Sequence, residues 1–251
     1  MDNPQIASVK RIDFLRVPVD VILEDELESI ILELDTREQS QVIVFLSYKD
    51  LMRARRDQEY LAFLKRAALV VPVSKSIENG IKFLAKPIPF RFHPFDFIIR
   101  ILGILEKKRK SIYLLGGKHR SLQTVATNLR ASFPTLAQVG RHAGYYPREM
   151  HDTILMAVQK ASPSVLFLGP GLPGRDKWSF RNISQLPRGI VLWSKLSFDI
   201  MSGFKARPSK ESFRKGTHEL GGVFYNPLKW MRSFSYIIYG IVLLFYKITH
   251  R

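Results

Sequence analysis

The sequence contains no cysteine among its 251 residues. Disulfides, thiolate nucleophiles and cysteine-ligated zinc or iron–sulfur sites are therefore excluded, and the absence fits a reducing compartment. The glycine period of collagen and the low apolar content of a disordered chain are also missing, since 46% of the residues are hydrophobic. We expect one large or two small globular domains with a substantial core.

Acidic residues are scarce, because 22 Asp and Glu stand against 39 Lys and Arg, a net charge of +17. Ten of the acids lie within residues 1–40, so the positive excess belongs to the rest of the chain. Such a field attracts phosphate-bearing ligands, nucleic acid or an anionic membrane surface. The N-terminus lacks the pattern of a secretory signal, so we expect the protein to stay in the cytoplasm.

Short β-branched runs alternate with helical stripes, which is typical of an α/β chain with a mostly parallel sheet. We expect a Rossmann-like sheet flanked by helices. The predicted strands are mostly apolar throughout, as buried parallel strands are, and cover residues 41–46, 68–73, 111–115, 135–141, 164–168 and 189–193. The predicted helices cover residues 23–34, 61–68 after the capping candidate Asp57, 95–107, and 147–161 with Pro147 in the first turn.

The composition changes near residue 204, since residues 201–251 carry nine bases and two acids. We divide the chain into an α/β domain, residues 1–204, and a basic appendage, residues 205–251. Its uncharged run, residues 233–246, has 14 residues, whereas a bilayer-spanning helix needs roughly 20. The bases on either side suit a helix lying on an anionic membrane surface through residues 228–251. A core helix or a dimer-forming helix is the alternative.

A glycine-rich turn follows the third predicted strand, at the edge where open parallel sheets bind ligands. Gly116 and Gly117 would let the backbone approach a phosphate. Lys118 and the start of the following helix would add positive potential. A plain tight turn is the alternative.

A second turn contains Gly169, Gly171 and Gly174, which match the dinucleotide pattern G-x-G-x-x-G. Two prolines stiffen this turn, and the next strand ends without an acidic residue for a ribose hydroxyl, which argues against a nicotinamide or flavin site. We expect the turn to open a short helix and to present Arg175, Asp176 and Lys177 to a ligand.

A polar rim with Asp199 and Arg207 follows the last predicted strand, and a solvated loop is the alternative. No spacing typical of a metal site or of a serine nucleophile occurs. We therefore expect neither a metal ion nor a cofactor. No nucleic-acid module is recognised either, so we expect no nucleic-acid partner.

Taken together, these segments resemble the WecG/TagA/CpsF glycosyltransferases over about residues 40–230. The resemblance lies in the order and spacing of short motifs rather than in any one of them. The motifs are Arg91 with Asp96, residues 113–118, residues 144–146, residues 169–178, Phe198 with Asp199, and Arg207 with Pro208.

The resemblance implies transfer of a hexose or N-acetylhexosamine-type sugar from a UDP-sugar to a polyprenyl-diphosphate-linked acceptor. It implies an inverting, metal-independent reaction in cell-envelope polysaccharide synthesis, catalysed by a peripheral protein on the cytoplasmic face of the plasma membrane. The UDP-sugar is then a donor substrate rather than a cofactor. A homo-oligomer is left open.

Site residues follow from the matched motifs and from chemistry. The residues expected to shape the nucleotide cleft are Gly116, Gly117, Gly169 and Gly171. Those expected to contact the donor are Lys118 and Arg175. One guanidinium group can donate parallel hydrogen bonds to two oxygens of a phosphate. The residues expected to bind the diphosphate of the lipid carrier are therefore Arg207, Arg214 and Arg232.

The sequence departs from the family where the resemblance implies a general base. The family has an Asp after the strand that here ends near residue 72, and this chain has Val73, which cannot accept a proton. Phe45 and Ser47 stand in the family's Thr-x-Asn segment, and Arg175 replaces its Gln. The carboxylates that could replace the base are Asp96, Asp176 and Asp199, with His93 as a weaker candidate. The alternative is a catalytically impaired relative that binds a nucleotide-sugar or a lipid-linked sugar as a partner protein.

Overall fold

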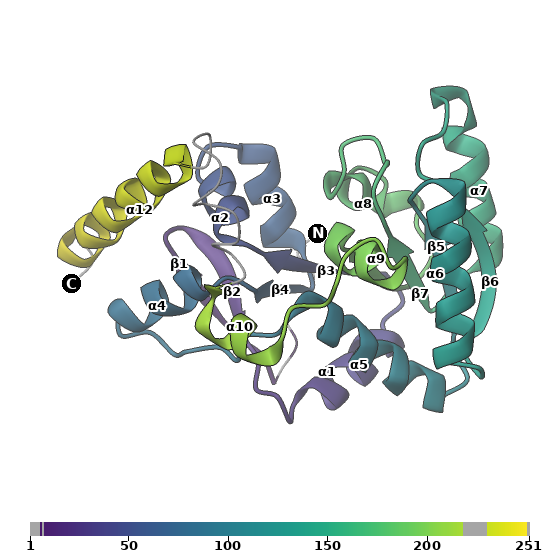
Figure 1. Cartoon of the computed structure of the whole chain (residues 1–251), viewed down its shortest axis with the longest axis horizontal. Helices are drawn as coiled ribbons and strands as arrows, with labels where there is room; N and C mark the ends of the chain where they lie inside the picture. Colours follow the sequence, from purple (N-terminus) through teal and green to yellow (C-terminus); the bar gives the residue numbers. More distant parts are fainter. Residues whose placement is uncertain (1–5, 7, 218–229, 250–251) are drawn as a thin grey trace.

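The computed structural model describes residue 6, residues 8–217 and residues 230–249, with side chains from residue 236 onward in the last segment. It is an α/β fold in which helices cover both faces of a six-stranded parallel sheet (Figure 1). The strands are β3 (Ser40–Leu46), β4 (Leu69–Pro72), β5 (Ser111–Leu115), β6 (Ala137–His142), β7 (Val165–Leu168) and β8 (Gly189–Trp193). Their order in the sheet is β4-β3-β8-β7-β5-β6. The predicted fold class is confirmed, and each predicted strand is present within two residues of its expected bounds.

A two-stranded antiparallel hairpin, β1 (Lys10–Phe14) and β2 (Val17–Val21), precedes the sheet and was not predicted. The hairpin is fixed to β4 by Asp20, which is buried and accepts a hydrogen bond from the Val70 amide at 2.6 Å. Arg11 pairs with the same carboxylate at 2.7 Å. The buried charge is thus compensated on both sides.

The helices in chain order are α1 (Leu27–Thr36), α2 (Tyr48–Ala54), α3 (Gln58–Arg66), α4 (Lys75–Phe83), α5 (Pro94–Lys107), α6 (His119–Ser132), α7 (His151–Ala161), α8 (Lys177–Arg181), α9 (Lys195–Met201), α10 (Lys210–Lys215) and α12 (Trp230–Thr249). Asp57 caps α3, as predicted, by accepting from the Tyr60 amide at 3.0 Å. The expected helix at 147–161 is corrected, because a 3-10 turn at Arg148–Met150 follows Pro147 and the α-helix begins at His151.

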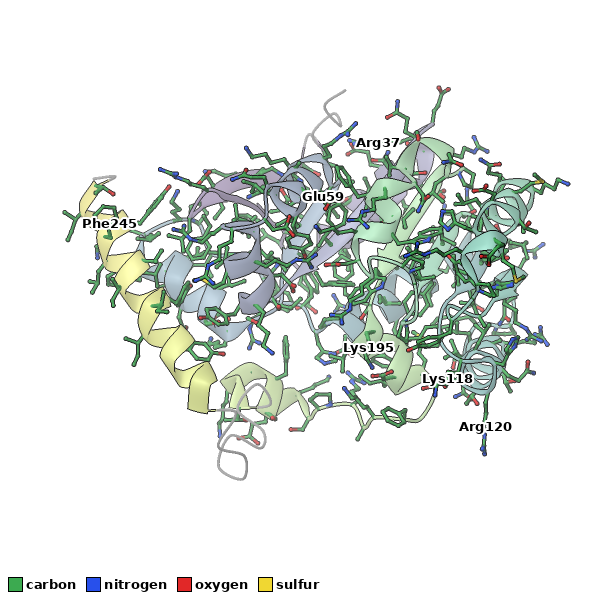
Figure 2. All side chains as sticks on the ribbon, turned by 90° about the horizontal axis from the view of Figure 1, so that it is seen from above. Arg37, Glu59, Lys118, Arg120, Lys195 and Phe245 are labelled. Atoms are coloured by element: carbon green, nitrogen blue, oxygen red, sulfur yellow. The ribbon has the colours of Figure 1, made fainter. Side chains whose placement is uncertain are left out.

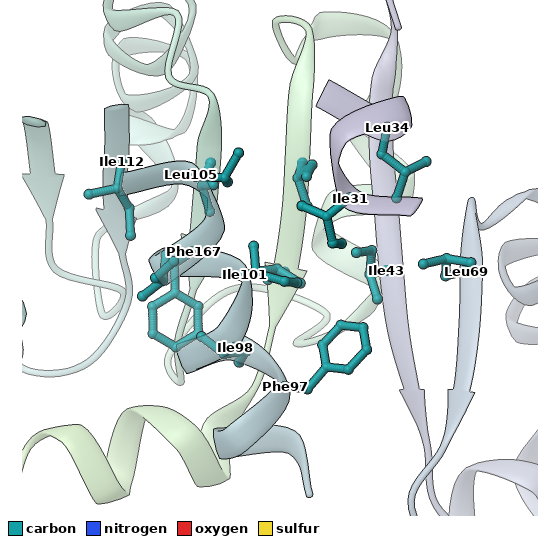
Figure 3. Close-up of a cluster of buried hydrophobic side chains, with 14 of the residues drawn as sticks. Ile31, Leu34, Ile43, Leu69, Phe97, Ile98, Ile101, Leu105, Ile112 and Phe167 are labelled. Carbon is teal, nitrogen blue, oxygen red and sulfur yellow. The ribbon is translucent and has the colours of Figure 1, made fainter. Parts of the chain in front are cut away.

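Alternating strand residues face two hydrophobic clusters, one on each side of the sheet. On one side Ile43 and Phe167 meet Ile98 and Ile101 of α5, and Ile31 of α1 closes this layer (Figure 3). The other side packs α2, α3, α7 and the hairpin. Because both faces are buried, the strands are apolar throughout, and only their ends are left for polar chemistry.

The C-terminal helix α12 lies at one end of the molecule against α2, α4 and β1 (Figure 1). Its inner face is tyrosine-rich: Tyr236 stacks on Tyr48 with ring centroids 4.5 Å apart, and the Tyr239 hydroxyl donates to the Ser76 carbonyl at 2.8 Å. The outer face of α12 is apolar and exposed, so α12 is not a core helix. The exposed side chains are Ile237 (58%), Ile241 (61%), Leu244 (55%), Phe245 (68%) and Ile248 (75%). Figure 2 shows Phe245 pointing away from the body.

No helix in the described part of the chain has the length and apolar character needed to cross a membrane.

Candidate functional site

A cavity of about 200 Å³ lies where β3, β4 and β8 end. Open parallel sheets bind ligands at this edge. Its walls are largely apolar, and Phe45, Trp193 and Val73 contribute to them. The residues with hydroxyl or charged side chains that line it are Ser47, Tyr60, Asp176, Ser179, Ser194 and Lys195.

The turns after β3 and β4 are held side by side at the cavity. Leu46 and Pro72 are register partners in the parallel pair, so Ser47 and Val73 occupy the next level on neighbouring strands. The Val73 amide donates to the Leu46 carbonyl at 3.0 Å, and the Tyr48 amide donates to the Ser74 hydroxyl at 3.1 Å. Ser47 is therefore fixed next to the position at which the resemblance implies a base.

Ser47 is also the N-cap of α2, in a reciprocal capping box with Asp50. The Ser47 hydroxyl donates to Asp50 Oδ2 at 2.5 Å, and the Asp50 amide donates to the Ser47 hydroxyl at 3.3 Å. Burial raises the pKa of the Asp50 carboxyl above its ordinary value, although the hydrogen bonds from Ser47 act in the opposite direction.

Asp176 is the one candidate base that lines this cavity. Its two oxygens lie 3.0 and 3.2 Å from an Arg53 nitrogen, and it caps α8 by accepting from the Lys177 amide at 3.1 Å. The Arg53 guanidinium stands 3.9 Å from the centre of the Tyr60 ring. Burial raises the pKa of the Tyr60 hydroxyl, and the nearby carboxylates Asp50 and Asp176 add to this effect.

The other two candidate bases lie elsewhere. Asp199, on α9, is buried and pairs with Lys195 at 2.7 Å. Asp96, in the first turn of α5, pairs with Arg207 at 2.7 Å. The three predicted carboxylates therefore do not converge on one point.

The two glycine turns do come together, as a close-packed junction. A side-chain carbon on Gly116 would lie 2.5 Å from the Gly169 backbone. The Gly117 amide donates to the Pro170 carbonyl at 2.7 Å, and the Gly169 amide donates to the Leu115 carbonyl at 2.8 Å. Gly117 and Gly169 both pack on the ring of Phe198, which is 1% exposed.

The amides of Gly117 and Gly169 therefore donate to the opposite segment, the Gly116 amide donates to the His142 carbonyl at 3.0 Å, and the buried Phe198 ring packs against both turns. Gly171, in the same loop, packs against Tyr145 instead. A direct contact of the four glycines with a nucleotide stays a prediction. So do the donor contacts of Lys118 and Arg175, which are exposed at the start of α6 and before α8. Arg175 has a positive φ of 55°.

A second cavity, of about 410 Å³, lies between the start of α5 and residues 207–213. We call it the basic cavity, because four cations line it, together with several aromatic rings and two carboxylates. The carboxylates are Glu24, which pairs with Arg100, and Asp96, which pairs with Arg207. The cations are Arg91, Arg100, Arg207 and Lys210. Phe95 and Phe213 are among the rings.

Arg91 ties this cavity to the first one. Its side chain is 6% exposed and pairs with Glu78 at 2.9 Å. It donates to the carbonyls of Phe213 at 2.6 Å, Arg214 at 3.1 Å and Val73 at 3.4 Å. The Arg214 side chain is exposed. The Arg232 side chain, also predicted to bind diphosphate, lies outside the described residues.

Within the described ranges, no group of three or more His, Asp or Glu side chains is placed to hold a metal ion.

Sequence reasoning missed Asp50, Arg53 and Tyr60 as neighbours of the cavity. The pattern Ser47-x-x-Asp50 signals a helix start. It does not show that the helix starts at a cavity.

Fold and site define an α/β protein whose ligand cavity lies at the carboxyl edge of its parallel sheet. The model of the glycosyl transferase WecG/TagA/CpsF family matches residues 12–251, and the chain belongs to this family. The predicted resemblance is thus confirmed.

Two relatives carry the name N-acetylglucosaminyldiphosphoundecaprenol N-acetyl-beta-D-mannosaminyltransferase. The protein of Bacillus subtilis (strain 168) is 24% identical over 193 residues, which cover 76% of this chain and 74% of the relative. The protein of Staphylococcus aureus (strain MRSA252) is 21% identical over 154 residues, 61% of this chain and 60% of that relative.

Proposed function

We propose that the protein transfers a hexose or N-acetylhexosamine-type sugar from a UDP-sugar to a polyprenyl-diphosphate-linked acceptor in cell-envelope polysaccharide synthesis. The family and the names of both relatives support transfer of a sugar to a lipid-linked acceptor. The observation that carries the proposal is the cavity at the ends of β3, β4 and β8, which presents Asp176 and serine hydroxyls next to the basic cavity.

The proposed reaction is inverting and independent of metal ions. An acceptor hydroxyl attacks the anomeric carbon while the bond from that carbon to UDP breaks, and UDP leaves with its diphosphate charge. Lys118 and Arg175 are the proposed cations for that charge, because positive groups stabilise a leaving diphosphate. Asp176 is the proposed hydrogen-bond acceptor for sugar hydroxyls in the cavity.

The basic cavity is the proposed site for the diphosphate of the acceptor. Arg207 and Lys210 line it, and guanidinium groups suit phosphate oxygens. The neighbouring rings would cover the apolar start of the lipid. Arg214 and Arg232 remain further candidates for the same diphosphate.

The outer face of α12 is the proposed contact with the cytoplasmic face of the plasma membrane. Its exposed apolar residues lie on one side of a helix whose other side is already packed on the body. Such a contact would hold the basic cavity near lipid-borne acceptors. A contact between two copies through the same face is the alternative.

The test is UDP release with a polyprenyl-diphosphate-linked N-acetylglucosamine acceptor and a panel of UDP-sugars that includes UDP-N-acetylmannosamine. We expect turnover with at least one donor. Asp176→Asn should lower kcat/KM about tenfold or more, because a hydrogen bond to a charged group contributes about 1.5–3 kcal/mol. Asp152→Asn, at an exposed carboxylate on α7, is the matched control and should be unchanged.

A binding protein without turnover is the second candidate function, and Val73 in the cavity wall is the observation that favours it. Calorimetry that detects binding of a UDP-sugar, together with no UDP release for any donor, would support this candidate and contradict the transferase.

A further inference from the structure

The transfer reaction needs a group that takes the proton of the attacking hydroxyl. Positioned acid–base groups typically speed such reactions about a hundredfold to ten-thousandfold. Val73 offers no such group, and the carboxylate that lines the cavity, Asp176, is already engaged. Both of its oxygens face Arg53, and one also accepts from the Lys177 amide. The Asp176 oxygens are thus already occupied by a guanidinium and an amide donor.

Ser47 lines the cavity and lies in register with Val73, which stands where the family has its base. It stands one residue beyond Leu46, as Val73 stands one residue beyond Pro72, and neighbouring strands run about 4.8 Å apart. A hydroxyl group has two acceptor lone pairs and one donor. The Ser47 hydroxyl donates to Asp50 Oδ2 and accepts from the Asp50 amide, which leaves one lone pair to accept a hydrogen bond from the cavity.

Asp50 stands behind Ser47, outside the cavity lining. In the described part of the chain Asp50 forms no salt bridge, whereas Asp176 pairs with Arg53. Burial raises the pKa of Asp50, so this carboxylate binds a proton more readily than an ordinary one. The charges of Asp176 and Arg53 act on the pKa of Asp50 in opposite directions, since Asp176 raises it and Arg53 lowers it.

We infer that Ser47 and Asp50 form the proton relay of the transfer reaction, a role that rests on the proposed function. The acceptor hydroxyl passes its proton to Ser47 Oγ, and the Ser47 proton passes to Asp50. The acceptor oxygen forms its bond to the anomeric carbon as the bond from that carbon to UDP breaks. Ser47 ends neutral, Asp50 ends protonated, and UDP carries away the electron pair. Asp50 returns its proton to water between turnovers.

A capping box has a structural role by itself, so the variants must separate capping from proton transfer. Asp50→Asn keeps a side-chain oxygen that can accept from the Ser47 amide, and it removes the proton acceptor. Ser47→Thr keeps the cap and the hydroxyl, whereas Ser47→Ala loses both. Thermal unfolding of each variant reports the capping contribution separately.

The experiment measures kcat and the donor KM for these variants between pH 5 and pH 9, with the donor and acceptor that turn over in the wild type. We expect Asp50→Asn and Ser47→Ala to lower kcat about a hundredfold or more with the donor KM changed less than threefold. Ser47→Thr should stay within about tenfold of the wild type. The wild-type kcat should fall toward acid pH as Asp50 becomes protonated, and Asp50→Asn should lose this dependence.

A wild-type kcat retained within threefold in Asp50→Asn would overturn the relay and leave the proposed function intact. An acid limb that persists in Asp50→Asn would overturn it as well. Absence of turnover in the wild type with every donor would instead overturn the proposed function, and the relay with it.

Discussion

At the scale of single residues, Gly116 illustrates how close the two turns lie. Its φ is 145°, and an added side-chain carbon would meet the backbone of Gly169, which cannot rotate away as a side chain could. We expect Gly116→Ala to lower the free energy of unfolding by about 3 kcal/mol, from overpacking and an unfavourable backbone conformation together.

The matched control is Gly203→Ala. Gly203 also has a positive φ, of 74°, but nothing lies within 4 Å of an added carbon. We expect this change to cost about 1 kcal/mol in urea denaturation. Equal costs for the two variants would show that the contact with Gly169 contributes nothing.

The same residues show where prediction from sequence ends. That Gly116 and Gly169 occupy turns at the ends of strands could be read from the pattern of apolar runs and glycines. The Phe198 ring between those turns comes from a helix about 30 residues further along the chain. Local patterns do not show such a contact, so a turn suited to a phosphate and a turn packed on a ring look alike.

At the scale of elements, α3 and α8 are joined by a charge network. Lys177 Nζ lies 2.5 Å from Glu59 and 2.8 Å from Asp57, and Arg181 lies 2.8 Å from Glu59. Hydrogen bonds from Arg181 and Lys177 lower the pKa of Glu59 to about 2. The hydrogen bond from Lys177 is the main cause that lowers the pKa of Asp57 to about 2.

Because these pKa values are depressed in the folded protein, the network stabilises it above the ordinary carboxyl range and ceases to do so as the pH falls toward 2. We expect the urea concentration at the unfolding midpoint of the wild type to decrease as the pH is lowered from about 4.5 to about 2. Lys177→Met should lower the midpoint at pH 7 and flatten this acid dependence. An unchanged slope in Lys177→Met would contradict the role of the network.

The long elements were easier to predict than the short ones. Helices such as α5, with 14 residues, repeat their apolar spacing over several turns. The helix α2, with 7 residues, and the hairpin β1–β2 are too short for a clear period. Of the two 9-residue helices, α3 begins with the side-chain cap Asp57 and was predicted, whereas α4 has no side-chain cap and was not. The cavity lies between such short elements, so its lining could be predicted only in part.

At the scale of the whole molecule, the exposed outer face of α12 makes the proposed membrane contact testable. We expect the protein to float with vesicles that contain anionic phospholipid. The double change Ile241→Ser and Phe245→Ser should weaken this binding at least about fivefold, because each of these side chains favours a bilayer by about 0.3–0.6 kcal/mol and serine does not. Met156→Ser, at a side chain of α7 that is 52% exposed, is the control and should bind as the wild type does.

Sedimentation of the same double variant decides between a membrane and a second copy of the chain. A wild type that dimerises in solution, with dimers lost in the double variant and vesicle binding unchanged, would contradict the membrane proposal.

The hydrogen bonds from Arg91 to the carbonyls of Phe213 and Arg214 have a practical consequence for exchanging the C-terminal appendage, residues 205–251, among members of this family. Whatever lipid it prefers, a transplanted appendage would have to offer two carbonyl acceptors to the Arg91 guanidinium, which is almost wholly shielded from solvent. A chimera without these acceptors would leave the buried Arg91 guanidinium short of hydrogen-bond partners. Because Arg91 also donates to the Val73 carbonyl, an exchange meant to change only where the protein binds would also disturb the cavity wall.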